Sequence, residues 1–161
     1  METKIISELT TENLHLVAES LRHGEVVAIP TETVYGLGAN GLDEASMDKI
    51  YAAKGRPSDN PLILHVPNAD SIKPLVKEIP DTAYKLIDAF WPGPLTITLP
   101  KSDLVPDRAT GGLDRVALRC PDHDICREVL SLAGVPIAAP SANISGRPSP
   151  TTAQAVYDDM N

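Results

Sequence analysis

Short apolar runs alternate with amphipathic helical segments along the chain, and this order constrains its fold more than any other feature. Between residues 14 and 21, leucine, valine and alanine recur at positions i, i+3, i+4 and i+7, which is typical of a helix with one apolar face. The next segment, Val26–Ile29, is wholly apolar and is followed by Pro30, as expected of a short strand buried on both faces. Repetition of this alternation predicts helices layered on a sheet, an α/β structure.

The rest of the chain continues the same order. We expect further strands at 62–66, 95–99, 116–120 and 135–139, and further helices from Asp43 to Gly55, from Asp81 to Pro92, from Asp122 to Ala133 and after Thr151 or Thr152. No helical segment separates the strands at 95–99 and 116–120, so a purely parallel sheet is not expected. We predict a single domain over residues 1–161, built as a twisted, mostly parallel or mixed sheet with flanking helices.

Composition narrows the classes of function. The chain of 161 residues has 14 Lys and Arg against 22 Asp and Glu, a net charge of -8, which argues against a surface that binds nucleic acid or anionic membranes as a whole. Cys120 and Cys126 are the only cysteines, so a disulfide framework and an all-cysteine zinc site are excluded. The N-terminus METKIISELT has no apolar signal core and no apolar run approaches membrane-spanning length; we expect a cytoplasmic protein.

Cationic, hydroxyl and amide side chains gather in four loops that adjoin the expected strands. The loops are PTETVYGLGAN (30–40), KGRPSDNP (54–61), LRCPDH (118–123) and PSANISGRPSP (140–150), and they present Thr31, Thr33, Lys54, Arg56, Asn60, Arg119, Ser141, Asn143 and Arg147. Any one of these residues commonly pairs with an acid or caps a helix. As a set in an acidic protein, they predict a site for a small anion such as a nucleotide, because guanidinium groups grip phosphate and carboxylate in a fork.

Other motifs are absent or out of place. The glycines of Gly36–Gly41 spell GxGxxG, but they begin seven residues past Ile29, whereas the dinucleotide fingerprint follows its strand directly; we expect tight turns with positive φ there. The sequence contains no GxxxxGK[ST], HExxH or GxSxG, so a P-loop, a zinc protease site and a nucleophile elbow are not expected, nor is a protein-held metal. From the residues alone, His65 reads as a packed strand histidine and Cys120 as a small buried hydrophobe.

Five segments in order resemble the YrdC-like family of threonylcarbamoyl-AMP synthases, from about Glu25 to Thr152. They are PTETVYGLGAN, KGRPSDNPLILHV, FWPGPLTITL, VALRCPDH and APSANISGRPSPT. The resemblance implies a twisted sheet around a basic cavity in which L-threonine, bicarbonate and ATP give threonylcarbamoyl-AMP and pyrophosphate. It further implies Mg²⁺ with ATP, held mostly by the triphosphate and water, and a downstream tRNA threonylcarbamoyl-transferase as partner.

The resemblance also assigns residues. It implies an L-threonine site at Thr33, His65, Arg119 and Ala139, an ATP site at Arg56, Asn60, Ser141, Asn143 and Arg147, and a catalytic role for Lys54, which faces phosphate, together with Arg56. Such a set suits the reaction, because attack of a carbamate oxygen on the α-phosphate needs alignment and charge neutralisation more than an acid–base pair.

Two departures and two alternatives remain open. Arg115 stands where the family often has a small hydroxyl residue, and the chain stops at Asn161, so a C-terminal part that completes the cavity is expected to be missing. One alternative is a non-catalytic module that binds double-stranded RNA or tRNA weakly through Lys101, Arg108, Arg115, Arg119 and Arg127. The other is a domain of a maturation enzyme that forms carbamoyl-adenylate from carbamoyl phosphate.

Overall fold

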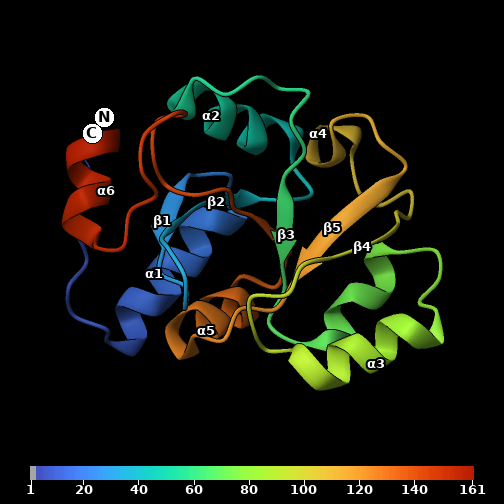
Figure 1. The fold of residues 1–161 in the computed structure, drawn as a ribbon. Helices are drawn as coiled ribbons and strands as arrows, with labels where there is room; N and C mark the ends of the chain where they lie inside the picture. The colour runs from blue at the N-terminus through green and yellow to red at the C-terminus, as the bar shows by residue number, and fades with distance from the viewer. Residues whose placement is uncertain (1–2) are drawn as a thin grey trace.

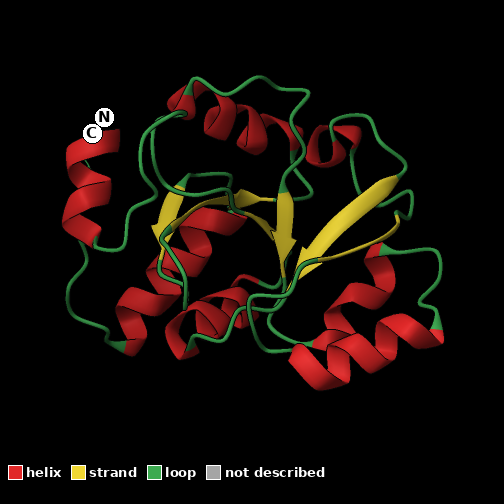
Figure 2. Cartoon of the chain, in the orientation of Figure 1, coloured by secondary structure: helices red, strands yellow, loops and turns green. Residues whose placement is uncertain are grey.

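A six-stranded sheet runs through the middle of the molecule, with helices on both of its faces (Figure 1 and Figure 2). The computed structural model describes residues 3–161. The strands are β1 (Val27–Ile29), β2 (Gly36–Asn40), β3 (Ile63–His65), β4 (Ile97–Pro100), β5 (Arg115–Arg119) and β6 (Ile137–Ala138), in the order β1-β2-β6-β3-β5-β4. The expected mixed sheet is confirmed, but only β3 and β5 pair in parallel and every other neighbouring pair is antiparallel.

The helices begin and end close to where local signals predict them. They are α1 (Thr11–Arg22), α2 (Glu44–Lys54), the 3-10 helix η1 (Ala69–Leu75), α3 (Asp81–Phe90), α4 (Asp107–Thr110), α5 (Asp124–Ala133) and α6 (Ala153–Met160). The side chains of Thr10, Asp43 and Thr152 accept a backbone N–H of the first turn, and Gly55 and Gly134 end their helices in the left-handed conformation. The helix predicted from Asp122 begins two residues later, and η1 and α4 were not predicted.

Two apolar clusters hold the layers together. Helices α1 and α5 pack against each other and cover one face of the sheet with Leu14, Leu21 and Leu130, which meet Ile29 and Ile137 of the strands. On the other side, the larger cluster joins α2, η1 and α3 to the central strands. Burial of this kind of side chain is the main stabilising term for a domain of this size. Within residues 3–161, no helix has both the length and the apolar character needed to cross a membrane.

The glycine-rich segment is a strand, and the prediction of tight turns there was wrong. None of Gly36, Gly38 and Gly41 has a positive φ. A Cβ atom at Gly38 would lie 3.0 Å from Cγ2 of Ile137, and one at Gly36 would lie 3.1 Å from Cβ of Ala139. Glycine is therefore needed for the close approach of side chains from the neighbouring strand, and a turn conformation is not involved.

Candidate functional site

The PTET loop (residues 30–40) and the PSAN loop (residues 140–150) lie side by side, as predicted. Gly36, which opens β2, forms an isolated antiparallel bridge with Ser141. The carbonyl of Tyr35 accepts the N–H of Ala142 at 2.8 Å, and the N–H of Tyr35 donates to the carbonyl of Pro150 at 2.9 Å. Backbone hydrogen bonds thus join two loops that are more than a hundred positions apart in the sequence.

The last residue of α2, Lys54, attaches a third loop to this pair of loops. Its ammonium is buried and donates to the carbonyl of Asn143 at 2.6 Å and to that of Ser141. Burial lowers the pKa of Lys54, and the neighbouring Arg56 lowers it further. This placement differs from the expectation that the ammonium faces phosphate, because two of its donors are used on backbone carbonyls that position the PSAN loop.

Arg56 and Asn60 lie on the loop that leaves α2. The Nη2 atom of Arg56 donates to the carbonyl of Pro61 at 3.1 Å, while its Nε is buried without a partner among residues 3–161. The Tyr51 hydroxyl, whose pKa is raised by burial, donates to the carbonyl of Asn60 at 2.8 Å. The Arg56 and Tyr51 side chains therefore hold the backbone of this loop, while the Asn60 side chain is exposed.

Asn143 and Arg147 are fixed by hydrogen bonds within their own loop and to α6. Asn143 is 5% exposed; its Nδ2 donates to the carbonyls of Ile144 and Arg147, each at 2.9 Å, and its Oδ1 is buried without a partner in the described part of the chain. Asp159 forms an ion pair with Arg147 and accepts the N–H of Ile144 at 2.7 Å. These contacts lower the pKa of the Asp159 carboxyl, and the hydrogen bond from Ile144 has the largest effect.

His65 and Arg119 are neighbours in the parallel register of β3 and β5. His65 is 3% exposed and burial lowers its pKa to about 4, so the ring is neutral at pH 7. Its Nδ1 lies 3.2 Å from the carbonyl of Ile63; because a carbonyl only accepts, this contact assigns the proton to Nδ1. The sequence interpretation of a packed strand histidine is confirmed, and the residue lies opposite Arg119, which is predicted to bind a carboxylate, in the strand register.

Arg119 connects the PTET loop to the end of β5. Its side chain is 11% exposed; Nη2 pairs with the Glu32 carboxylate and lies 3.4 Å from the Thr33 hydroxyl, and Nε donates to the carbonyl of Gly93 at 3.3 Å. Burial lowers the pKa of the Arg119 guanidinium. Ala139, the remaining residue of the expected threonine site, is buried directly after β6 and donates its N–H to the carbonyl of Ile63 at 3.1 Å.

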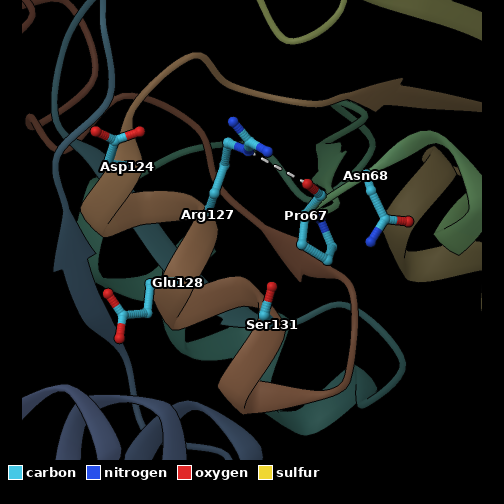
Figure 3. Close-up of a pocket in the computed structure, with 6 residues that line it drawn as sticks. All are labelled: Pro67, Asn68, Asp124, Arg127, Glu128 and Ser131. Atoms are coloured by element: carbon cyan, nitrogen blue, oxygen red, sulfur yellow. Dashed lines mark hydrogen bonds between the residues drawn. The ribbon is translucent and has the colours of Figure 1, made fainter. Parts of the chain in front are cut away.

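The loops that carry the expected residues are connected in turn: Lys54 donates to the PSAN loop, this loop pairs with the PTET loop, and Thr33 of the PTET loop lies 3.4 Å from Arg119. The expected residues line neither of two surface hollows found elsewhere. One, of about 320 Å³, is lined by Pro67, Asn68, Asp124, Arg127, Glu128 and Ser131 and is shown in Figure 3. The other, of about 370 Å³, is lined by Glu44, Ser58, Asp59, Asp107, Arg108, Gly111 and Gly112. An enclosed basic cavity remains a prediction.

The thiols and acids of the described residues show no reactive or metal-binding cluster. Burial raises the pKa of Cys126 to about 12 and that of Cys120 in the same direction, so both thiols are protonated and inert at pH 7. No group of three or more His, Cys, Asp or Glu residues within 3–161 is arranged to hold a metal ion. The interpretation of Cys120 as a buried hydrophobe is confirmed.

The cationic side chains considered for RNA binding each form an ion pair or a hydrogen bond with another group of this protein. Lys101 pairs with Asp107 at 3.0 Å and Arg108 with Asp48 at 2.9 Å, while Arg115, Arg119 and Arg127 donate to Thr98, Gly93 and Pro67 carbonyls. Arg115 extends toward β4 and away from the PSAN loop, so the departure noted at this position adds no contact to the candidate site.

Comparison with known proteins identifies the family. The model of the Sua5/YciO/YrdC family, described as telomere recombination, matches residues 19–161. The chain belongs to the Sua5/YciO/YrdC family.

Curated relatives of this chain, and the solved structure of one relative, agree with the match. The threonylcarbamoyl-AMP synthase of Pyrococcus abyssi is 56% identical over 147 residues, 91% of this chain and 43% of that protein. The enzyme of the same name from Bacillus subtilis is 49% identical over 98% of this chain and 46% of its own. The crystal structure of P. abyssi Sua5 complexed with L-threonine superposes with a TM-score of 0.94 at 52% identity, over 98% of this chain and 47% of that one. The chain spans less than half the length of these relatives.

Two carboxylates that engage the family's expected arginines were missed by sequence reasoning. Glu32 and Asp159 each pair with a guanidinium through one oxygen and accept a backbone N–H through the other, from Asp122 and Ile144 respectively. The only sequence signal for Glu32 is its position next to Thr33. Its partner Arg119 lies far along the chain, and pairing over such a separation has no local pattern.

Proposed function

We propose that this chain forms threonylcarbamoyl-AMP and pyrophosphate from L-threonine, bicarbonate and ATP, for threonylcarbamoyladenosine modification of tRNA. The observation that carries the proposal is the meeting of Arg119, Thr33 and His65 at one end of β3 and β5. A nearly buried guanidinium beside a hydroxyl, with a neutral histidine on the adjacent strand, suits the carboxylate and hydroxyl of a small amino acid. The curated relatives with the same activity in their name, and the likeness to Sua5 bound to L-threonine, support the same substrate.

In the proposed reaction the amine of threonine first captures the carbon of bicarbonate, with loss of water, to give a carbamate. A carbamate oxygen then attacks the α-phosphorus of ATP; the new P–O bond forms as the bond to the β-phosphate oxygen breaks, and pyrophosphate leaves with that electron pair. Arg119 and Thr33 would hold the amino acid in place. Arg56, Asn60, Ser141, Asn143 and Arg147 would align the nucleotide, which is the main requirement of this chemistry.

Lys54 and Arg56 have different roles in this proposal. Lys54 fixes the PSAN loop through two carbonyls and adds positive charge behind the nucleotide, whereas Arg56 has a buried Nε that a nucleotide oxygen can satisfy. The buried Oδ1 of Asn143 is an acceptor suited to an N–H or O–H of the nucleotide. Both unsatisfied atoms thus support a polar ligand next to the PSAN loop.

Magnesium would enter with ATP. The described residues offer no cluster of acids for a protein cage, which fits a Mg²⁺ ion held by triphosphate oxygens and water. The ion would neutralise charge on the phosphates. We further propose a cytoplasmic location. We also propose a tRNA threonylcarbamoyl-transferase as the next enzyme, because the product is a reactive mixed anhydride that must be consumed by group transfer.

Pyrophosphate release tests the proposal. We expect release from ATP and Mg²⁺ that requires both L-threonine and bicarbonate, and formation of a product with the mass of threonylcarbamoyl-AMP. Replacement of threonine and bicarbonate by carbamoyl phosphate should release none; release with carbamoyl phosphate would favour the carbamoyl-adenylate alternative. Absence of both L-threonine binding and threonine-dependent release would refute the proposed function.

A further inference from the structure

The side chain of Glu32 sits where the carboxylate of a bound amino acid would be expected. Glu32 lies on the loop between β1 and β2, and its side chain is 20% exposed. One carboxylate oxygen pairs with Nη2 of Arg119, and the other accepts the N–H of Asp122, the residue that lies between β5 and α5. The carboxylate therefore bridges a guanidinium and a backbone amide, an arrangement that an α-carboxylate could reproduce.

The donors of Arg119 show why both carboxylates cannot bind in full. Nε is used on the carbonyl of Gly93, and Nη2 pairs with Glu32 and lies 3.4 Å from the Thr33 hydroxyl. A carboxylate binds a guanidinium best through two parallel N–H donors, and with Nε occupied that fork consists of Nη1 and Nη2. Glu32 already holds the Nη2 half of the fork.

We propose that Glu32 is an internal competitor: its carboxylate occupies the Arg119 guanidinium until the carboxylate of the incoming amino acid displaces it. This inference rests on the proposed function for the identity of the ligand as L-threonine. The pairing neutralises Arg119 while the site is empty, which matters because the side chain is 11% exposed and an unpaired charge there is costly.

Displacement has a measurable consequence for affinity. If Glu32 holds the site closed in most molecules, the apparent dissociation constant of the ligand exceeds the intrinsic one by the inverse of the open fraction. Removal of the competing charge should therefore tighten carboxylate binding. A partly exposed ion pair of this kind corresponds to roughly fivefold in affinity.

The experiment compares the wild type with Glu32→Gln and Glu32→Ala by calorimetry, with L-threonine, L-threoninamide and acetate as ligands at constant ionic strength. Glu25→Gln is the matched control, because Glu25 forms an exposed ion pair with Lys49 at 3.5 Å on the surface. We expect both Glu32 variants to bind L-threonine and acetate about fivefold more tightly. Binding of L-threoninamide, which lacks the carboxylate, should not change, and the control should match the wild type.

The outcomes separate this inference from the proposed function. Tighter acetate binding by the Glu32 variants, with no preference for L-threonine over acetate in any variant, would support the competitor and refute the proposed substrate. L-threonine binding that is unchanged or weaker in the Glu32 variants would overturn the competitor and leave the proposed function standing. Absence of carboxylate binding in every variant would overturn both. Thermal melting of each variant confirms that the comparison is made between folded proteins.

Discussion

The Nζ atom of Lys54 lies 2.6 Å from the carbonyl oxygen of Asn143, 89 residues further along the chain. A second contact, to the carbonyl of Ser141, completes a buried clamp between the end of α2 and the PSAN loop. The two loops that carry most of the proposed ATP residues are therefore held together by this ammonium group and by the N–H of Ser145, which donates to the carbonyl of Lys54 at 3.0 Å.

Removal of this ammonium should cost stability. In Lys54→Met the aliphatic stem is retained and two carbonyls lose a charged donor, so we expect the free energy of unfolding to fall by about 2–4 kcal/mol. Urea denaturation measures this change. Lys49→Met is the matched control: Lys49 lies on the same helix and donates to the carbonyl of Gly24 at 2.7 Å, but its side chain is 49% exposed. A loss of less than about 1 kcal/mol is expected there, and equal losses in both variants would contradict the clamp.

The sequence predicted those features of the fold that depend on local signals. Asp43 and Gly55 bracket α2 as expected, because a capping carboxylate and a left-handed glycine act within one helical turn. Strand β2 was missed because glycine has a low strand propensity, and the segment is extended because it pairs with β1 and β6. The carbonyl partners of Lys54 and the ion-pair partner of Glu32 were missed because they lie far away in the sequence.

In the candidate site, too, features with a local sequence motif were predicted and contacts between distant residues were not. The loop motifs predicted which segments meet, and Thr33 and Arg119 do meet. The motifs contain no information on which acids neutralise the cations, so Asp159 and the pairing of Arg147 had no sequence signal.

Close packing at Gly38 gives a second prediction. In Gly38→Ala the added Cβ would lie 3.0 Å from Cγ2 of Ile137 and 3.1 Å from the carbonyl oxygen of Val27. Overpacking of this kind should lower the free energy of unfolding by roughly 1–3 kcal/mol. The double variant Gly38→Ala/Ile137→Ala should show a combined loss smaller than the sum of the two single losses, because the truncation removes the clashing methyl. Additive losses would show that the contact with Ile137 is not the cause.

Arg119 should control binding of the amino acid more than binding of the nucleotide. In Arg119→Lys the planar fork is lost while the charge remains, and we expect L-threonine affinity to fall by about tenfold to a hundredfold. The affinity for ATP should change by less than about twofold, because the proposed nucleotide residues lie on other loops. Arg115→Lys, on the same strand with its guanidinium on the carbonyl of Thr98, is the control and should bind both ligands normally. Calorimetry with each ligand alone measures these affinities, and an equal loss for ATP would mean that the two sites are assigned wrongly.

His65 makes the stability of the fold depend on pH. Burial lowers its pKa from 6.5 to about 4, so between these values the unfolded chain binds a proton that the folded chain does not. The contribution is fully present above about pH 6.5 and is lost as the pH falls toward 4, and the shift corresponds to about 3 kcal/mol. In His65→Gln this titration disappears, so the free energy of unfolding should vary less between pH 7 and pH 4.5 than it does in the wild type. Urea denaturation at both pH values measures the difference, with His15→Gln, a substitution at an exposed histidine of α1, as the control. If the slope between pH 7 and pH 4.5 is as steep in His65→Gln as in the wild type, acids elsewhere, and not this imidazole, set the acid sensitivity of the fold.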